Sequence, residues 1–438
     1  MQKQLQHSAL ALCFTLLMIA VSTQLAWTAE SLSDRAIAQS QFKIRRHPNN
    51  PAGYYQLGDA YVQKSRESGD NSYLDLAEQA LKKSLSLNPQ QSGVRRHLAH
   101  VLASRHDFEG AAAEAQKAIA LDPTDMDAHG VLGDAYLETG KPEQAEQAYK
   151  TMMTLQESLS SYSRRSGMKS LKGDASGAIA DLKTAIELGK QEKQPKESIA
   201  WAQWQLGAEY YAIGKLAEAE NDYLQALETY PKYYRSLAGL AQVRVAQERY
   251  PEAIELYREA INTVPMPEYV AALGDVYAMS GNQNEARKQY ELVEYIGQLS
   301  ALNKALYNRE LAYFYADHDI KLQQGLELAQ RELDYRRDIY AYDVLAWNLY
   351  KNGKFEEARG AVRQALKLGT QDAKLHYHAG MIYQRVGEKA KAREHLRRAL
   401  SINPHFHIFF ADNAKRTLVE LENSEEQVAA ARQPLEGR

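Results

Sequence analysis

Apolar residues recur along most of this chain with the spacing of a helix. A leucine is followed directly by a small residue and, three positions after that, by a tyrosine or another apolar residue, as in Leu132, Gly133 and Tyr136. Residues three and four positions apart share one helix face, so each copy of this pattern predicts a helix with one apolar stripe. Its small residues stand at positions 58, 99, 133, 207, 241, 274, 312, 346 and 380, most of them 33 or 34 residues apart.

A second apolar stripe follows each copy of the first. Thirteen residues after the leucine comes another small residue, then a bulky residue four positions on, as in Ala145 and Tyr149. A glycine such as Gly140 stands between the two stripes, where a helix end favours the left-handed conformation. A proline closes five copies, at positions 89, 123, 231, 265 and 404. The unit is therefore predicted to be a helical hairpin of about 34 residues, whose apolar faces are buried only when hairpins stack.

These residues resemble the tetratricopeptide repeat family, whose pattern of Leu-Gly, Tyr, Ala and Pro they match with tyrosine often replacing phenylalanine. The resemblance covers about residues 51–405 in ten copies, and implies an all-α, right-handed superhelical α-solenoid with helical caps. The stretches around Phe314, His378 and Asn403 are similar to an uncharacterised group of exported bacterial members. The pattern is broken in three places: the first copy has an insertion around Ser65 to Tyr73, and the copies near 158–190, where Ser166 is the small residue, and near 306–337 are degenerate.

The ends of the array carry patterns of their own. Residues 30–50 are expected to form an N-terminal capping helix, and residues 406–423 a C-terminal capping helix with Phe409 and Phe410 on its apolar side. Residues 424–438 are expected to be disordered.

Residues 1–29 are expected to be a signal peptide. A stretch of thirteen residues, Ala9 to Val21, is apolar except for Thr15; it is too short to span a bilayer and fits the core of an export signal. Cleavage is expected near Ala26 or Ala29, although Trp27 suits a cleavage site poorly, so an uncleaved anchor is the alternative. The mature chain is then predicted to be periplasmic or secreted in a bacterium, with no stable membrane span.

Composition excludes several classes of function. The 438 residues include 53 basic and 56 acidic ones, for a formal net charge of -3, which gives no electrostatic footprint for nucleic acid. A mean hydropathy of -0.54 excludes a polytopic membrane protein. The single cysteine, Cys13, lies in the expected signal, so the mature chain has neither disulfide nor thiolate chemistry.

No motif predicts catalysis, a metal or a cofactor. Nucleophile-elbow and phosphate-loop patterns are missing from the sequence. His97 and His100 share a helix face but lack a carboxylate in register, and Arg95 and Arg96 beside them would repel a cation. The run Asp317-His318-Asp319 is better explained as a helix end followed by an Asp cap for the next helix. We therefore predict a protein that is not an enzyme.

The inner stripe of the first helices is the predicted binding surface. With the signature leucine as position 7, positions 2, 5, 9 and 12 form a stripe beside the packing stripe. Rigid aromatic and arginine side chains on such a stripe are typical anchors for a peptide or protein, although packing between neighbouring first helices is the alternative. The candidate residues are Trp201, Trp204, Tyr211, Arg309, Tyr313, Tyr340, Trp347, Tyr350 and Tyr377.

Two functions are consistent with this surface. The favoured one is a non-enzymatic exported scaffold that binds a peptide or protein of unknown identity in the concave groove. The alternative is a carbohydrate-handling or polysaccharide-export assembly factor, because tryptophan and tyrosine rings also stack on sugars. The lysine and asparagine clamp for carboxylates that some family members use is not recognisable here.

Overall fold

The computed structural model describes residues 32–302 and 307–432, and all of their regular structure is helical. The expected signal peptide, residues 1–29, lies outside the described residues. The chain divides into two compact units, Met1–Gln90 and Gln91–Arg438. The predicted fold class, an all-α solenoid of helical hairpins, is confirmed.

The first unit contains one hairpin and the helix that precedes it. Helix α2 packs along α3, and α3 pairs with α4. The bounds are α2 (Leu32–Arg46), α3 (Pro51–Ser68) and α4 (Ser72–Leu87). Asn50 caps α3 by accepting a hydrogen bond from the Ala52 amide, and Gly69 ends it in the left-handed conformation.

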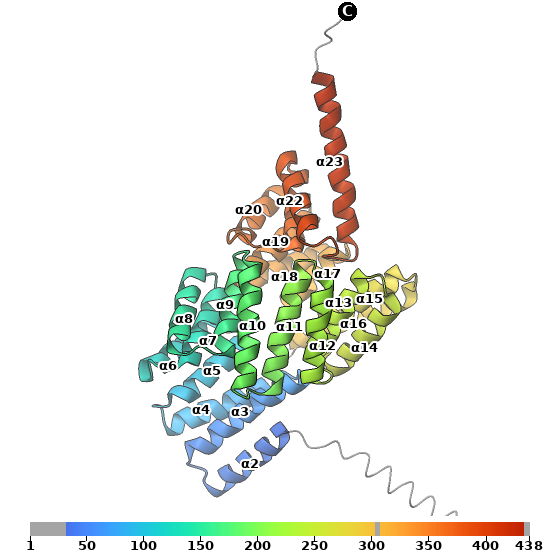
Figure 1. Ribbon diagram of the computed structural model, residues 1–438. Helices are drawn as coiled ribbons and strands as arrows, with labels where there is room; N and C mark the ends of the chain where they lie inside the picture. Colours follow the sequence, from blue (N-terminus) through green and yellow to red (C-terminus); the bar gives the residue numbers. More distant parts are fainter. Residues whose placement is uncertain (1–31, 303–306, 433–438) are drawn as a thin grey trace, which may run out of the picture. The chain divides into compact units, whose positions relative to one another are not determined.

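The second unit contains nine hairpins in its described residues, followed by a closing helix (Figure 1). In each pair the odd-numbered helix is the first helix and the even-numbered one the second. The pairs are α5 (Ser92–Ser104) with α6 (Phe108–Leu121), α7 (Met126–Glu138) with α8 (Pro142–Leu155), α9 (Leu159–Leu171) with α10 (Ala175–Gln191), α11 (Lys196–Ala212) with α12 (Leu216–Thr229), α13 (Tyr234–Ala246) with α14 (Tyr250–Thr263), α15 (Pro267–Met279) with α16 (Gln283–Leu302), α17 (Asn308–Asp317) with α18 (Leu322–Tyr335), α19 (Ile339–Lys351) with α20 (Phe355–Ala365), and α21 (Ala373–Arg385) with α22 (Lys389–Ile402).

A small residue on the first helix faces a large side chain on the second in many of these pairs. A Cβ atom placed on Gly207 of α11 would lie 2.7 Å from the ring of Tyr223 on α12. Tyr223 also lies against Gly239 of the next hairpin, so one ring fills the space within a hairpin and between two hairpins. The small residues of the sequence pattern are therefore sites of close helix approach.

The loops of distant hairpins in the second unit meet along a line that we call the seam. At one point of the seam Arg336 forms an ion pair of 2.9 Å with Glu138, and the Arg337 amide donates to the Glu138 carbonyl over 2.7 Å. At another, Asn403 donates to the Tyr211 carbonyl over 2.8 Å. Gly140 has a φ of +76° at the seam, and a Cβ there would lie 2.7 Å from the Arg337 carbonyl oxygen.

Both copies predicted to be degenerate fold as ordinary hairpins. In α9 and α10 the irregular residues Arg165 and Lys169 form ion pairs with Asp181, which replaces apolar packing. In α17 and α18 the first helix is short, and Gly325 contacts Asn348 of α19. The Asp cap predicted after α17 is wrong, because the residue before α18 is Lys321 and no side chain caps that helix.

The C-terminal prediction needs correction. Helix α23 spans Phe410–Arg432, so it starts later and ends later than the predicted 406–423. Disorder was predicted from residue 424, but the helix includes residues 424–432; residues 433–438 lie outside the described part. Alanine, glutamine and glutamate in this stretch have high helix propensity, which the sequence prediction ignored.

The helices of residues 32–302 and 307–432 are all too short or too polar to span a membrane.

Gly207→Ala tests the close contact. Alanine normally stabilises a helix interior relative to glycine by about 0.5–1 kcal/mol. Here we expect a loss of about 1–3 kcal/mol instead, because the methyl group would overlap the Tyr223 ring. Thermal unfolding followed by circular dichroism measures the shift. The matched control is Gly360→Ala on α20, which has open space at its Cβ position and should be neutral or stabilising. Equal effects of the two changes would contradict the packing account.

Candidate binding surface on the first helices

All nine predicted surface residues lie on first helices of the second unit. Trp201, Trp204 and Tyr211 are on α11, Arg309 and Tyr313 on α17, and Tyr377 on α21. Tyr340, Trp347 and Tyr350 are on α19. The structure places these residues in three different environments.

Trp347 and Tyr377 are not exposed anchors, which corrects the prediction. Their exposed fractions are 1% and 3%. Trp347 stacks on His378 with ring centroids 4.2 Å apart, and Tyr377 stacks on Phe410 at 4.9 Å. Phe410 comes from the chain that follows the last hairpin, so this C-terminal segment covers positions that an open groove would expose. Both rings are core residues.

A buried polar network holds this aromatic cluster. The Tyr313 hydroxyl donates to Asp343 over 2.7 Å, and His378 Nδ1 lies 2.9 Å from the same carboxylate. Burial, followed by the Asp343 charge, raises the pKa of Tyr313 well above its ordinary value. Tyr350 is half-buried and stacks on Trp347 with centroids 4.9 Å apart. Tyr313 and Tyr350 therefore support the core and leave little free surface.

Further charged and polar groups lie around the same aromatic cluster. Asp317 accepts from Trp347 Nε1 over 2.8 Å and from Lys374 Nζ over 2.9 Å. Burial opposes ionisation of Asp317, but the charge and hydrogen bond of Lys374, together with the nearby histidines, outweigh it and lower the pKa. Burial, followed by Lys374, lowers the pKa of His407 to about 3, so its ring is neutral near pH 7.

Three of the predicted residues lie at the seam. Arg309 forms ion pairs with Glu332 at 3.2 Å and Asp338 at 2.9 Å, and the Tyr211 hydroxyl donates to the His405 carbonyl over 3.2 Å. Burial raises the pKa of Tyr211 to about 12. Arg309 and Tyr340 also line a cavity of about 150 Å³. That volume is below the roughly 300 Å³ of ordinary ligand pockets, so these residues close the unit and leave no room for a polypeptide.

Trp201 and Trp204 remain half-buried on α11 and pack on neighbouring helices through one side. The Arg235 guanidinium lies over the Trp204 ring, 5.1 Å from its centroid, and 5.2 Å from that of Tyr234. Within residues 32–302 and 307–432, no carboxylate forms an ion pair with Arg235. This surface therefore carries an arginine that stacks on two aromatic rings and has no ion pair in the described structure.

Sequence reasoning missed Arg235 and Glu268. Both occupy the register position of Trp201 in the next two hairpins, so applying the stripe to every copy would have found them. Burial, followed by Glu310, raises the pKa of Glu268 to about 7, although its side chain is exposed to solvent. One carboxylate oxygen of Glu310, Oε2, is buried without a hydrogen-bond partner in the described structure.

Metal binding finds no support in the described residues, where no group of three or more histidine, cysteine, aspartate or glutamate side chains is arranged to hold an ion. His376 contacts His395, with Nδ1 atoms 2.9 Å apart, and His318 contacts Asp275 at 2.7 Å. These histidines hold helices together.

Comparison with known proteins agrees with this architecture. The fold is that of a solenoid of helical hairpins, a class built for contact over an extended surface. Models of the tetratricopeptide repeat match residues 102–154, 204–269 and 344–405. The chain thus contains tetratricopeptide repeats, and proteins with such repeats generally mediate contacts between proteins.

The similar proteins each match only part of this chain. The human protein O-mannosyl-transferase TMTC1 is 25% identical over 236 residues, 52% of this chain and 25% of that protein. The chicken (Gallus gallus) DnaJ homolog subfamily C member 3 is 25% identical over 219 residues, 44% of this chain and 43% of that protein. The chain thus spans less than half the length of either relative. A solved structure of human IFIT1 has a TM-score of 0.49 at 15% identity, with 73% of each chain covered.

His407→Phe tests the buried charge cluster. In the unfolded chain His407 takes up a proton near its ordinary pKa of 6.5, whereas in the folded chain it does so near 3. The wild-type chain therefore loses stability from this residue as pH falls below 6.5, by up to about 1.4 kcal/mol per pH unit. Phenylalanine can keep the stacking on Phe410, so the melting temperature of the variant relative to wild type should rise between pH 6.5 and 4. A difference that stays constant from pH 8 to 4 would show that His407 is not held neutral.

Proposed function

We propose that this chain is a non-enzymatic scaffold that binds a polypeptide segment of another protein on α11, α13 and α15, with Arg235 as the central anchor. Contact between proteins is the general role of tetratricopeptide repeats. The finer assignment rests on one observation, the stacked Arg235 without an ion pair in the described structure.

The position of Arg235 favours a ligand role over a structural one. It lies in the first turn of α13, where the helix dipole disfavours a positive charge. The residue before α13, Tyr233, provides no side-chain cap, and the first turn contains no acidic residue. An arginine held rigidly over aromatic rings keeps its planar N–H groups free for a carboxylate. We therefore expect the bound segment to place a carboxylate on Arg235, from either an acidic side chain or its C-terminus.

The polysaccharide alternative lacks an observation in its favour. Sugar binding needs exposed ring faces, whereas Trp347 and Tyr377 are buried and Arg235 covers one face of Trp204. The remaining surface combines a stacked cation with acidic side chains such as Glu268, which suits a polypeptide with charged groups better than a neutral sugar.

Export is part of the same proposal. The apolar run Ala9 to Val21 and the lack of cysteine after Cys13 support a chain that works in a bacterial envelope or outside the cell. The expected partner is then a protein of that compartment.

Replacing Arg235 by alanine tests the anchor. Immobilised wild-type chain should retain a protein from envelope extracts, and Arg235→Ala should weaken its binding by about 1–4 kcal/mol, as for a central interface arginine. Arg258→Ala is the matched control, because Arg258 is exposed on α14 and pairs with Glu255. Equal retention by both variants would rule out Arg235 as the anchor, and binding that survives protease treatment of the extract would favour a polysaccharide.

N-terminal sequencing tests export. Protein isolated from the periplasmic fraction should begin just after Ala26 or Ala29. A chain that begins at Met1 in the membrane fraction would support the uncleaved anchor instead.

A further inference from the structure

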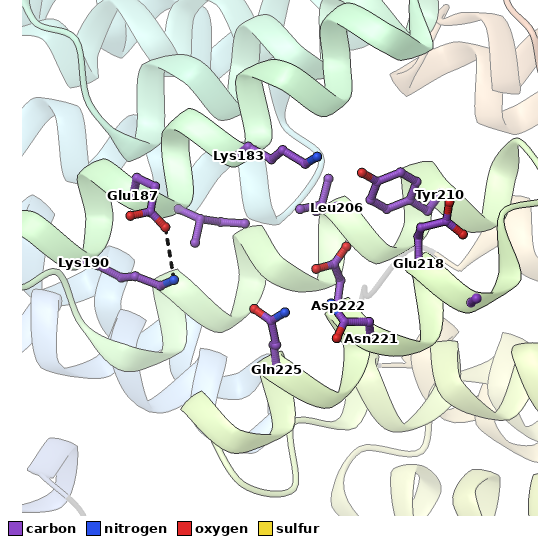
Figure 2. A pocket seen from close by; sticks show the side chains of 11 residues that line it. Lys183, Glu187, Lys190, Leu206, Tyr210, Glu218, Asn221, Asp222 and Gln225 are labelled. Carbon is purple, nitrogen blue, oxygen red and sulfur yellow. Dashed lines mark hydrogen bonds and ion pairs between the residues drawn. The ribbon is translucent and has the colours of Figure 1, made fainter.

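A larger cavity lies on the other side of the hairpins, between the second helices α10 and α12. Its volume is about 630 Å³, within the range of ordinary ligand pockets. Ile186, Leu206 and Tyr210 provide its apolar part, and Lys183, Glu218 and Asp222 lie among its polar side chains. Figure 2 shows the Asp222 carboxylate pointing into this space, with Lys183 and Tyr210 across from it.

Asp222 is a buried carboxylate without a cationic partner. Its exposed fraction is 7%, and within residues 32–302 and 307–432 no cation lies at ion-pair distance from it. Burial raises its pKa to about 6, and Glu218 adds to the increase while Lys183 and Asn221 oppose it. An unpaired buried charge lowers the stability of the fold, so a buried carboxylate without a cation indicates a role other than stability.

The preceding hairpin shows how this chain normally accommodates an aspartate at that register. Asp181 of α10 corresponds to Asp222 of α12, since each stands three residues after the small residue of its second helix, Ala178 or Ala219. Asp181 is 4% exposed and forms ion pairs with Arg165 at 2.7 Å and Lys169 at 2.9 Å. These two cations lower its pKa despite burial.

The two cations are replaced in the next hairpin. Leu206 stands where Arg165 stands one hairpin earlier, and Tyr210 stands where Lys169 stands. Both replacements line the cavity beside Asp222. The α11–α12 hairpin thus keeps the buried carboxylate, loses its internal cations and has an open volume next to it.

The two lysines that line the cavity do not form an ion pair with the Asp222 carboxylate. The Lys183 ammonium lies 5.7 Å from the centroid of the Tyr210 ring, and the Lys190 ammonium forms an ion pair of 3.2 Å with Glu187. Neither cation is within ion-pair distance of Asp222.

We propose that this cavity binds an alkylammonium or guanidinium group supplied from outside the chain, with its charge on Asp222 and its aliphatic stem on Leu206 and Ile186. The group takes the place that Arg165 and Lys169 fill in the preceding hairpin. The chemistry is shared by a free aliphatic diamine and by a basic side chain of a bound polypeptide. This site is independent of Arg235, which lies on a first helix.

Ligand-observed NMR on the full chain tests the charge requirement. The probe is n-pentylamine, and 1-pentanol has the same stem without the charge. The amine should bind saturably, and the alcohol at least tenfold more weakly. Asp222→Asn should weaken amine binding at least tenfold, whereas Glu255→Gln, on the exposed face of α14, should leave it unchanged. Equal binding of amine and alcohol, or an Asp222→Asn variant that binds like wild type, would overturn the proposal.

A second variant supplies the missing cation from within. Tyr210→Lys recreates the Lys169 position, so it should abolish amine binding. Stability gives a separate readout: Asp222→Asn should keep or raise the melting temperature, because it removes an unpaired charge, while Asp181→Asn should lower it, because it breaks two ion pairs. A large loss of stability in Asp222→Asn would show that the carboxylate already has a structural partner.

Competition against n-pentylamine tests whether the bound ammonium group comes from a free diamine or from a polypeptide side chain. Cadaverine represents a free diamine, and the peptide acetyl-Gly-Lys-Gly-amide represents a basic side chain. Stronger displacement by one of them identifies the source, and displacement by neither contradicts the site.

Discussion

Close approach of two helices at a small residue is the constraint on which the rest of this structure depends. At Gly207 the backbone of α11 comes so near to α12 that the ring of Tyr223 occupies the space of a side chain, and the same ring reaches Gly239 in the next hairpin. Each tyrosine therefore fixes the spacing within one hairpin and the position of its neighbour. Because these contacts repeat, the stack is the cooperative unit, and side chains beside the packing stripe are placed by its geometry.

The segment after the last hairpin then decides which parts of the inner stripe stay available. Asn403 and His405 bond to Tyr211 at the seam, and Phe410, a few residues later, covers Trp347 and Tyr377. One short stretch of chain thus joins α11 to the last hairpins and closes the aromatic cluster. Ile408 of the same segment also packs against the apolar cluster of α13 and α15, the helices that carry Arg235 and Glu268 in their first turns.

Period, helix order and hairpin number could be predicted from the sequence, because they follow from small residues and glycine turns at fixed spacing. The environment of individual stripe residues could not. Trp201 and Trp347 lie on the same stripe, at positions 2 and 9, yet one is half-buried and the other is core; Trp347 is covered in part by Phe410, more than sixty residues later in the chain. The same holds for Arg309, whose partner Asp338 belongs to the next hairpin. Contacts of this range leave no periodic trace in a single sequence.

Charges with a structural role in this chain can be told from candidate binding charges by whether they form ion pairs. Buried or half-buried charges are mostly matched in place: Arg165 with Asp181, Arg309 with Asp338, and Lys374 with Asp317. Within the described residues Arg235, a stacked cation on a first helix, and Asp222, a buried carboxylate on a second helix, depart from that rule, as does Glu310, whose Oε2 is buried without a hydrogen-bond partner. Desolvation of an unmatched charge opposes folding, so each is a position where an incoming group of opposite charge gains most.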